Sequence, residues 1–178
     1  AVVTAAFAYA VMSFLMTATP INMHIMENYN LNKTGIVIQL HIVSMFLPSL
    51  ITGNLLKKFG HSKIIYAGVG FYTLTILLSF LEPSFFNYIL ALVFLGLGWN
   101  FLYLSGTGLM VLSYKEEEKF KAQGFNDILV FSTQALASLS AGYILSMTSW
   151  KTMNLITIPF LILIIFSSIR ADLSKDNR

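Results

Sequence analysis

Residues 53–63 read GNLLKKFGHSK, a short basic segment between two long apolar runs. Its glycines, Gly53 and Gly60, permit a tight reversal of the chain, and its lysines suit a loop at a membrane surface. The flanking runs, 34–56 and 62–81, each provide the roughly 20 mostly apolar residues that an α-helix needs to cross the hydrocarbon core of a bilayer. This segment therefore predicts a turn between two membrane-spanning helices.

The composition of the whole chain agrees with a membrane protein. Of its 178 residues, 56% are hydrophobic and 11% are charged, and the mean hydropathy is +0.73. A soluble domain carries roughly 25% charged residues, so a water-soluble globular protein is excluded. The absence of cysteine excludes disulfides and thiolate metal sites. The net charge of +3 is too small and too dispersed for a nucleic-acid-binding face, so no nucleic-acid partner is expected.

Breaks in the hydropathy divide the chain into apolar runs that each have the length of a membrane span. The six predicted spans are 1–26, 34–56, 62–81, 86–112, 123–147 and 150–170. The breaks between them carry turn and charge signals, for example Glu82-Pro83-Ser84, which stops one helix and can start the next. We therefore expect an all-α, polytopic membrane protein with a single six-helix domain over residues 1–178.

Lysine and arginine residues predict how these helices are oriented. Cytoplasmic loops carry an excess of basic residues over the loops on the other side. One set of alternate loops, with the C-terminal tail, holds nine of the eleven basic residues: Lys57, Lys58, Lys63, Lys115, Lys119, Lys121, Arg170, Lys175 and Arg178. The opposite loops hold Lys33 and Lys151. Both termini are therefore expected in the cytoplasm.

Polar side chains inside the predicted spans indicate where a cavity lies. A polar group in the hydrocarbon must find a partner or face a cavity, and in several spans such groups recur at helical spacing on one face. The spans 62–81 and 150–170 hold few polar side chains and are expected to face lipid. We predict that the substrate cavity is lined by Thr17, His41, Ser44, Asn100, Tyr103, Thr107, Gln134 and Ser138.

Some of these residues have a second explanation that the sequence leaves open. His41 has either a proton-coupling or ligand role or a hydrogen bond between two helices. Asn100 and Gln134 have the donors and acceptors to bind a solute, and they serve equally well to hold helices together. Ala141 and Gly142, with small residues just before them, predict a close-packed seam between helices.

Charged groups near the expected cytoplasmic surface suggest a gate. Asp127 lies in the first turns of the span 123–147, where the positive end of the helix dipole stabilises an anion. We expect its carboxylate to pair with Lys57 or Lys58 and to bias a conformational equilibrium. Together with Gly53 and Gly60 of the connecting loop, these residues form the predicted cytoplasmic gate.

The segment 53–63 resembles a loop of the major facilitator superfamily, which joins the second and third helix of each half and reads G-x-L-a-D-r-x-G-r-k. The matching positions are Gly53, Leu55, Leu56, Lys58 and Gly60. Lys57 stands where the family has its acid, and His61-Ser62 replaces the basic pair, a degeneration usual in the C-terminal half. Further stretches resemble helices 7, 8, 10 and 11 of bacterial members: TATPINM at 17–23, IQLHIVSMFLPSLITG at 38–53, LGLGWNFLYLSGTGL at 95–109 and AQGFNDILVF at 122–131.

This resemblance implies that the chain is the C-terminal six-helix half of a secondary active transporter. Such a transporter has twelve helices, and its two bundles rock about a midplane site to move a small solute across the membrane. The implied partners are the lipid bilayer, the solute, with coupling to protons left open, and an N-terminal six-helix half. The implied location is the cell membrane, here a bacterial inner membrane, and no cofactor is implied. Because the chain starts at Ala1 inside an apolar run, we interpret it as a segment of a longer protein.

Other classes of membrane protein also use six spans. A rhomboid-type serine protease needs a G-x-S-G serine in its fourth span and a histidine base in its sixth. Tyr103 stands in place of that glycine, and the span 150–170 has no histidine. The N-P-A and T-V-G-Y-G motifs of channels are absent, as are H-E-x-x-H and clustered carboxylates for a metal. A non-transporting receptor or assembly subunit would need a large polar surface on the outer loops, and these are only a few residues long; the sequence leaves this alternative open. The prediction is a transporter and not an enzyme.

Overall fold

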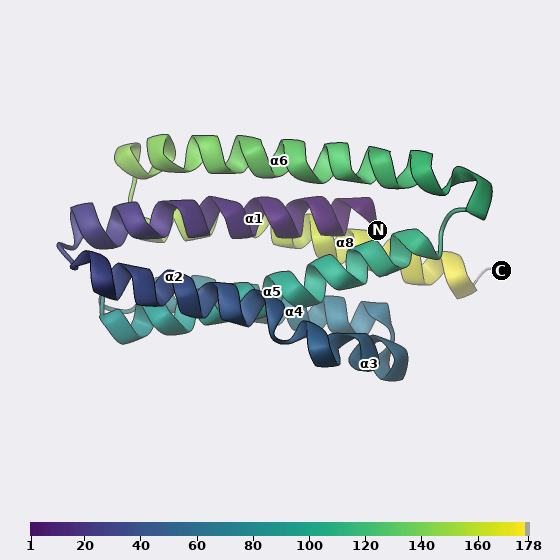
Figure 1. Cartoon of the computed structure of the whole chain (residues 1–178), viewed down its shortest axis with the longest axis horizontal. Coiled ribbons are helices and arrows are strands. Elements are labelled where there is room, and N and C mark those ends of the chain that lie inside the picture. Colours follow the sequence, from purple (N-terminus) through teal and green to yellow (C-terminus); the bar gives the residue numbers. More distant parts are fainter. Residues whose placement is uncertain (177–178) are drawn as a thin grey trace.

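The computed structural model describes residues 1–176, and every regular element in this range is a helix (Figure 1). The α-helices are α1 (Val2–Ile21), α2 (Leu31–Phe46), α3 (Ser49–Phe59), α4 (His61–Leu78), α5 (Phe85–Val111), α6 (Lys119–Met147), α7 (Trp150–Ile156) and α8 (Ile158–Asp176). A short π-helix, η1 (Asn22–Met26), continues α1, and a 3-10 turn, η2 (Glu116–Glu118), precedes α6. The prediction of an all-α fold is confirmed for this part of the chain.

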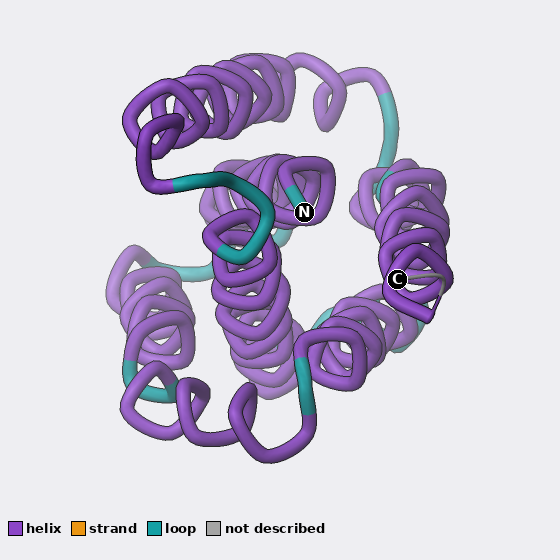
Figure 2. Tube along the Cα trace, turned by 90° about the vertical axis from the view of Figure 1, so that its right-hand side faces the viewer, coloured by secondary structure: helices purple, strands orange, loops and turns teal. Residues whose placement is uncertain are grey.

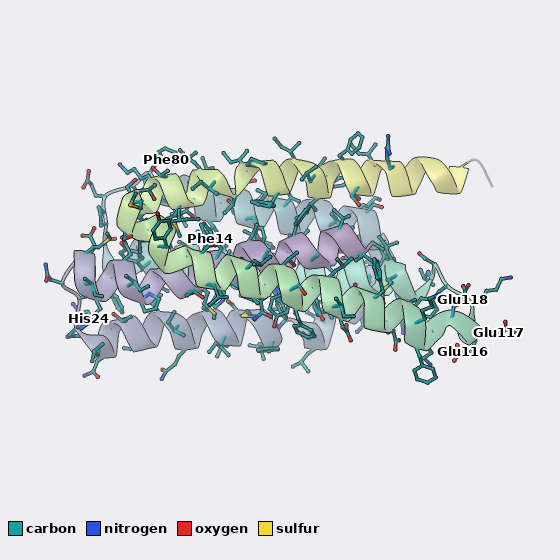
Figure 3. All side chains as sticks on the ribbon, turned by 90° about the horizontal axis from the view of Figure 1, so that it is seen from above. Phe14, His24, Phe80, Glu116, Glu117 and Glu118 are labelled. Atoms are coloured by element: carbon teal, nitrogen blue, oxygen red, sulfur yellow. The ribbon has the colours of Figure 1, made fainter. Side chains whose placement is uncertain are left out.

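The helices run back and forth between two ends of the bundle. Figure 1 shows both termini, the α3–α4 turn and the α5–α6 connection at one end, with η1 and the α6–α7 connection at the other. In Figure 3, Glu116, Glu117 and Glu118 likewise lie at the end opposite to His24. Connections that are alternate in the sequence therefore lie together in space, as a polytopic membrane protein requires.

The basic residues follow this division into two ends. Lys57 at the end of α3 and Lys119 at the start of α6 lie at the end that carries the termini, whereas Lys33 and Lys151 follow connections at the other end. The side chain of Lys175 and residue 178 lie outside the described residues. Which end faces the cytoplasm stays a prediction from the positive-inside rule.

Four helical segments are long and apolar enough to cross a membrane: Val2–Met26, Phe85–Val111, Glu116–Met147 and Trp150–Arg170. The pair α2 and α3 adds a fifth if the two helices, which are bent by 41°, count as one span. The 18-residue helix α4 occupies the place of the predicted span 62–81 but is not among these segments. The helices are therefore those of a membrane protein, and the division into six spans stays a prediction.

The predicted span 34–56 is bent and not continuous. Leu47 and Pro48 separate α2 from α3. Proline has no backbone N–H to donate, and its ring clashes with the carbonyl group four residues earlier, so a helix bends or breaks at this position. The side chain of Asn100 on α5 forms hydrogen bonds on both sides of the bend. The bend is thus held in place by a neighbouring helix.

The helix α5 is central, because it packs against α1, α2 and α4. Glycines allow its backbone to approach two of these neighbours closely. A Cβ atom at Gly106 would lie 2.8 Å from the backbone nitrogen of Ala5 on α1. A Cβ atom at Gly68 on α4 would lie 3.2 Å from the carbonyl oxygen of Gly98 on α5. The hydrophobic core lies around these crossings, between α1, α4 and α5.

The helix α6 packs on α1 through one face only. The hydroxyl oxygens of Thr17 on α1 and Ser138 on α6 lie 2.9 Å apart and form a hydrogen bond. Ala141, one turn further along α6, is fully buried, which agrees with the predicted small-residue seam. The remaining faces of α6 are uncovered in this chain, and Leu139 is 81% exposed.

Four helices, α1, α2, α5 and α6, form one side of the bundle. Figure 1 shows α6 and the pair α2 and α3 on either side of α1, with α4 and α8 fainter behind. Figure 2, seen from the end with the termini, places the start of α1 in the middle of the bundle. We call the side formed by α1, α2, α5 and α6, away from α4 and α8, the front face.

Candidate functional site on the front face

Five aromatic side chains from four helices meet on the front face. They are Tyr9 of α1, Phe46 of α2, Trp99 and Tyr103 of α5 and Phe131 of α6, and we call them the aromatic cluster. Trp99 and Tyr103, one helical turn apart, are stacked with ring centroids 4.9 Å apart and ring planes at 8°. Each ring lies in the middle part of its helix, or of the bent pair, so the cluster lies at mid-depth in the bundle.

Edge-to-face contacts extend the aromatic cluster from α2 to α6. The ring centroid of Phe46 lies 5.8 Å from that of Trp99. The centroid of Tyr9 lies 5.3 Å from that of Trp99 and 5.5 Å from that of Tyr103. On the other side, the centroid of Phe131 lies 6.2 Å from that of Tyr9. Aromatic pairs favour these separations and tilts, so the rings form one continuous row.

The members of the aromatic cluster differ in how far they are covered. Trp99 is only 5% exposed, and Tyr9 and Tyr103 are half-buried. Phe46 and Phe131, at the two ends of the row, are 59% and 52% exposed. Trp99 therefore forms the floor of the cluster, and the two phenylalanines form its open rims.

A polar stripe on α6 borders the aromatic cluster. Asp127, Phe131, Gln134 and Ser138 follow one another at steps of four, three and four residues, so they share one face of the helix. Asp127 is exposed and close enough to Tyr103 for an electrostatic interaction, and Gln134 is half-buried. A carboxylate is costly on a lipid-facing surface and is tolerated where it faces water or a partner. The stripe therefore favours a front face that borders a cavity.

The predicted site residues on α2 lie at a helix–helix contact. His41 is fully buried, and its Nδ1 lies 2.7 Å from the carbonyl oxygen of Leu92 on α5. Its Nε2 is buried and has no hydrogen-bond partner among the described residues. The hydroxyl of Ser44 donates to the carbonyl oxygen of His41 at 2.7 Å, within α2. In this conformation both side chains hold backbone groups, and a role in transport stays a prediction.

Asn100, another predicted cavity residue, is buried with its amide fully used. Its Nδ2 donates to the carbonyl oxygen of Met45 and to the hydroxyl of Ser49, both at 2.7 Å. Its Oδ1 accepts from the hydroxyl of Thr52 at 2.6 Å. Thr107 donates to the backbone carbonyl of Tyr103 in its own helix at 2.8 Å. Of the predicted residues on α5, only Tyr103 presents its side chain to the aromatic cluster.

The residues of the predicted gate are spread apart in this conformation. Gly60 has a φ angle of +81° and separates α3 from α4, so this position of the tight turn requires glycine. Lys57 and Lys58 are exposed at the end of α3, on the opposite side of α1 from Asp127 on α6 (Figure 1). Within residues 1–176, no ion pair joins them to Asp127. The gate therefore stays a prediction for another conformation.

Sequence reasoning missed most of the aromatic cluster. The prediction followed polar groups, which are rare in hydrocarbon, and of the five rings it named only Tyr103 as a cavity residue. A usable signal existed, because Trp99 and Tyr103 have the spacing of i and i+4 and Phe131 lies on the polar stripe of α6. The contributions of Tyr9 and Phe46 depend on how α1 and α2 are placed against α5, which no local pattern reveals.

Two cavities lie away from the aromatic cluster. One of about 280 Å³ lies among polar residues at the end of the bundle near η1, and includes Glu27, Glu82 and Lys151. The other, of about 430 Å³, is apolar and lies between α1, α6 and α8, beside Phe14. Within the part of the chain that the structure describes, no group of acidic and histidine side chains could hold a metal ion.

Several known proteins are similar to this chain. It is 37% identical over 160 residues to the riboflavin transporter RfnT of Brucella anthropi, a match that covers 88% of this chain and 39% of that protein. It is 35% identical over 151 residues to the uncharacterized MFS-type transporter YddS of Bacillus subtilis, covering 83% and 34% of the two chains. It is 30% identical over 132 residues to the uncharacterized transporter YebQ of Escherichia coli, covering 74% and 28%. The chain thus spans between about a quarter and two fifths of the length of these relatives.

The match to a protein-family model covers more of the chain than the matches to these relatives do. The model described as Major Facilitator Superfamily matches residues 1–176, almost the whole chain. No solved structure matches at a comparable level of significance. The family match and the relatives together confirm the resemblance that the segment 53–63 carries: this chain belongs to the Major Facilitator Superfamily.

Proposed function

We propose that this chain is the C-terminal half of a secondary transporter that moves a small solute by alternating access. The match to RfnT covers 88% of this chain but only 39% of that protein, which supports a partner bundle elsewhere in the complete transporter. Family membership favours transport over the protease and receptor alternatives. In the proposed mechanism, this bundle and an N-terminal six-helix bundle rock against each other about a shared site near the bilayer midplane.

The observation that carries the proposal is the aromatic cluster with its polar stripe. Four helices bring these side chains together at mid-depth, and Phe46 and Phe131 are left more than half exposed. A second bundle placed against the front face would cover them and enclose a cavity with aromatic walls and Asp127 at its edge. Small-molecule sites have this composition, mostly apolar with a few polar groups.

Riboflavin is the first solute to test, because the relative RfnT is named as its transporter. The proposed location is the cell membrane, with both termini in the cytoplasm. For coupling to protons, Asp127 is the group to test first, because it is exposed beside the aromatic cluster, whereas His41 is fully buried.

The proposal is tested with the full-length protein in lipid vesicles. We expect uptake of radiolabelled riboflavin above that of protein-free vesicles, and exchange of the label when unlabelled riboflavin is placed inside. Uptake that follows an imposed pH gradient in the parent but not in Asp127→Asn would support proton coupling. No uptake of riboflavin or of any other small solute in a broad panel would contradict a transport function.

A further inference from the structure

We propose that the aromatic cluster is a stacking subsite for a planar, fused-ring heteroaromatic solute, with Tyr103 and Phe131 as its contact rings and Asp127 at its edge. This inference rests on the proposed function, because it names the chemical class of solute that the cavity accepts. It also predicts which derivatives of that class the site rejects.

The ring of Tyr103 is half-buried, and Trp99 is stacked on one of its two faces. The planes of the Trp99 and Tyr103 rings are only 8° apart, and Tyr9 meets Tyr103 edge-on at 82°. Among the described residues, no other ring is stacked on Tyr103. A planar solute against the other face would extend the stack of Trp99 and Tyr103 by one ring system, an arrangement that aromatic rings favour at centroid distances of about 4.5–7 Å.

Phe131 supplies a second wall. Its ring and that of Tyr103 both contact the ring of Tyr9, at 6.2 Å and 5.5 Å between centroids, so the two lie close together beside Tyr9 on the front face. Phe131 is 52% exposed although it shares a helix face with Asp127 and Gln134. An apolar ring exposed on a polar stripe is available to a solute that is itself flat and apolar on its faces.

The edge of this place is polar. Asp127 lies one helical turn before Phe131, is exposed, and interacts electrostatically with Tyr103. A carboxylate accepts hydrogen bonds only, so it binds a ring N–H or a hydroxyl group of the solute. It also repels a nearby anion. The subsite therefore takes neutral or cationic heteroaromatic solutes with a donor group, and it rejects their phosphorylated derivatives.

Trp99 is a positioning residue in this scheme. It is 5% exposed, and its parallel stack fixes the plane of the Tyr103 ring from behind. Its indole Nε1 has no hydrogen-bond partner among the described residues, so the side chain acts through its ring and not through its N–H group. Trp99→Phe is expected to keep the binding of ring solutes within about threefold.

The test uses the purified full-length protein and four probes. Riboflavin carries a fused ring and a polyol tail. Lumichrome carries a closely related fused ring without the tail, and ribitol is the tail alone. Flavin mononucleotide carries the ring and the tail, with a phosphate at the end of the tail. Binding of the fluorescent probes is measured by quenching of their emission, and ribitol is tested as a competitor. We expect riboflavin and lumichrome to bind with similar affinity, ribitol not to compete at a hundredfold excess, and flavin mononucleotide to bind at least about tenfold more weakly than riboflavin.

Variants assign the binding to the named side chains. Tyr103→Leu and Phe131→Leu each remove one ring, and each should weaken lumichrome binding by about 2- to 10-fold. Tyr103→Phe keeps the ring and should retain more of the binding than Tyr103→Leu does. The matched control is Phe125→Leu, on the same helix and 60% exposed but outside the cluster, which should leave binding unchanged. Asp127→Asn should reduce the discrimination between riboflavin and flavin mononucleotide.

The outcomes separate this inference from the proposed function. Lumichrome binding no stronger than that of ribitol, or equal binding by the parent and both leucine variants, would overturn the subsite, even if vesicles take up another solute and transport stands. Ring binding that depends on Tyr103 and Phe131, without uptake of any solute, would leave the subsite standing and overturn transport. Because Phe131 is exposed, its variant tests the subsite even if Tyr103→Leu fails to fold.

Discussion

At the scale of single residues, Asn100 shows how a buried amide can be used completely by the protein itself. It bonds to Met45 and Ser49 through its two N–H groups and to Thr52 through its oxygen, so it ties α5 to both parts of the bent pair. Amides and hydroxyls between membrane helices contribute about 0.6 kcal/mol on average, and up to about 2 kcal/mol. Three such bonds at one side chain make Asn100 the main polar anchor of this bend.

Asn100→Ala should lower the stability of the folded protein by about 1–3 kcal/mol, because it removes these bonds and leaves their partners buried and unpaired. The measurement is thermal unfolding of the purified protein in detergent, followed by size-exclusion chromatography. Gln134→Ala is the control, since Gln134 is half-buried and no hydrogen bond of its side chain is found among the described residues. Equal melting temperatures for the two variants would show that the Asn100 network is not a stabilising anchor.

The same residue shows what periodicity can predict. The stripe of α5 singled out Asn100, and that of α2 singled out His41, as polar groups that need either a partner or a cavity. Each contacts a backbone carbonyl group of a neighbouring helix, that of Met45 for Asn100 and that of Leu92 for His41, and every residue type possesses such a group. A sequence pattern carries no information about such partners, so it could not distinguish a helix contact from a cavity.

At the scale of helices, close approach of backbones sets the position of α5. A Cβ atom at Gly106 would lie 2.8 Å from a backbone nitrogen of α1, and a backbone atom cannot move aside as a flexible side chain can. Gly106→Ala should therefore destabilise the protein by about 1–3 kcal/mol through overpacking.

Gly70 on α4 offers the matched control for this prediction. It has no atom within 4 Å of an added Cβ, so Gly70→Ala should be neutral or stabilising, by up to about 1 kcal/mol, through helix propensity alone. In thermal unfolding, Gly106→Ala should lower the melting temperature, and Gly70→Ala should leave it unchanged or raise it. Shifts of the same sign and size would contradict the crossing of α1 and α5.

The contact of α1 with α6 can be measured with a double-mutant cycle. Thr17→Ala, Ser138→Ala and the double variant remove the hydroxyl–hydroxyl bond of 2.9 Å from either side. We expect a coupling energy of about 0.6 kcal/mol, the average for such bonds in membranes, from unfolding in denaturant and detergent. Additive effects of the two substitutions would mean that the bond contributes nothing.

The sequence predicts the helices better than it predicts where they bend or break. The turn at Gly60 and the small-residue seam at Ala141 were both expected, because glycine and alanine act locally. Pro48 was visible inside the span 34–56, but proline in a membrane helix is tolerated when neighbours satisfy the freed backbone groups. Whether it merely kinks the helix or separates α2 from α3 depends on α5, which lies far away in the sequence.

At the scale of the whole molecule, the distribution of basic residues predicts the orientation in the membrane. The long apolar helices were predictable from hydropathy because bilayer thickness fixes their length. A reporter enzyme that is active only in the cytoplasm should work when fused after Lys63 or Lys119, and should be silent when fused after Lys33 or Glu82. The opposite result would mean that the bundle has the inverted orientation in the membrane. Activity at loops on both sides would contradict the alternation of the helices across the membrane.

The front face was not predictable in the same way, because four helices from separate parts of the chain build it. Their packing brings Phe46 and Phe131 to the two ends of one aromatic row. We expect this face to border a water-filled cavity in the complete transporter and not to face lipid.

The most direct test of this claim is cysteine accessibility on α6 of the full-length protein in native membranes. Gln134→Cys lies on the polar stripe, whereas Leu139→Cys lies outside it at a residue that is 81% exposed in this chain. This segment has no native cysteine, so it adds no background to the labelling by a small, polar, membrane-impermeant thiol reagent. We predict that Gln134→Cys is labelled and protected by excess solute, and that Leu139→Cys is not labelled because lipid covers it. Labelling of Leu139→Cys with an unreactive Gln134→Cys would contradict the cavity and the function proposed from it.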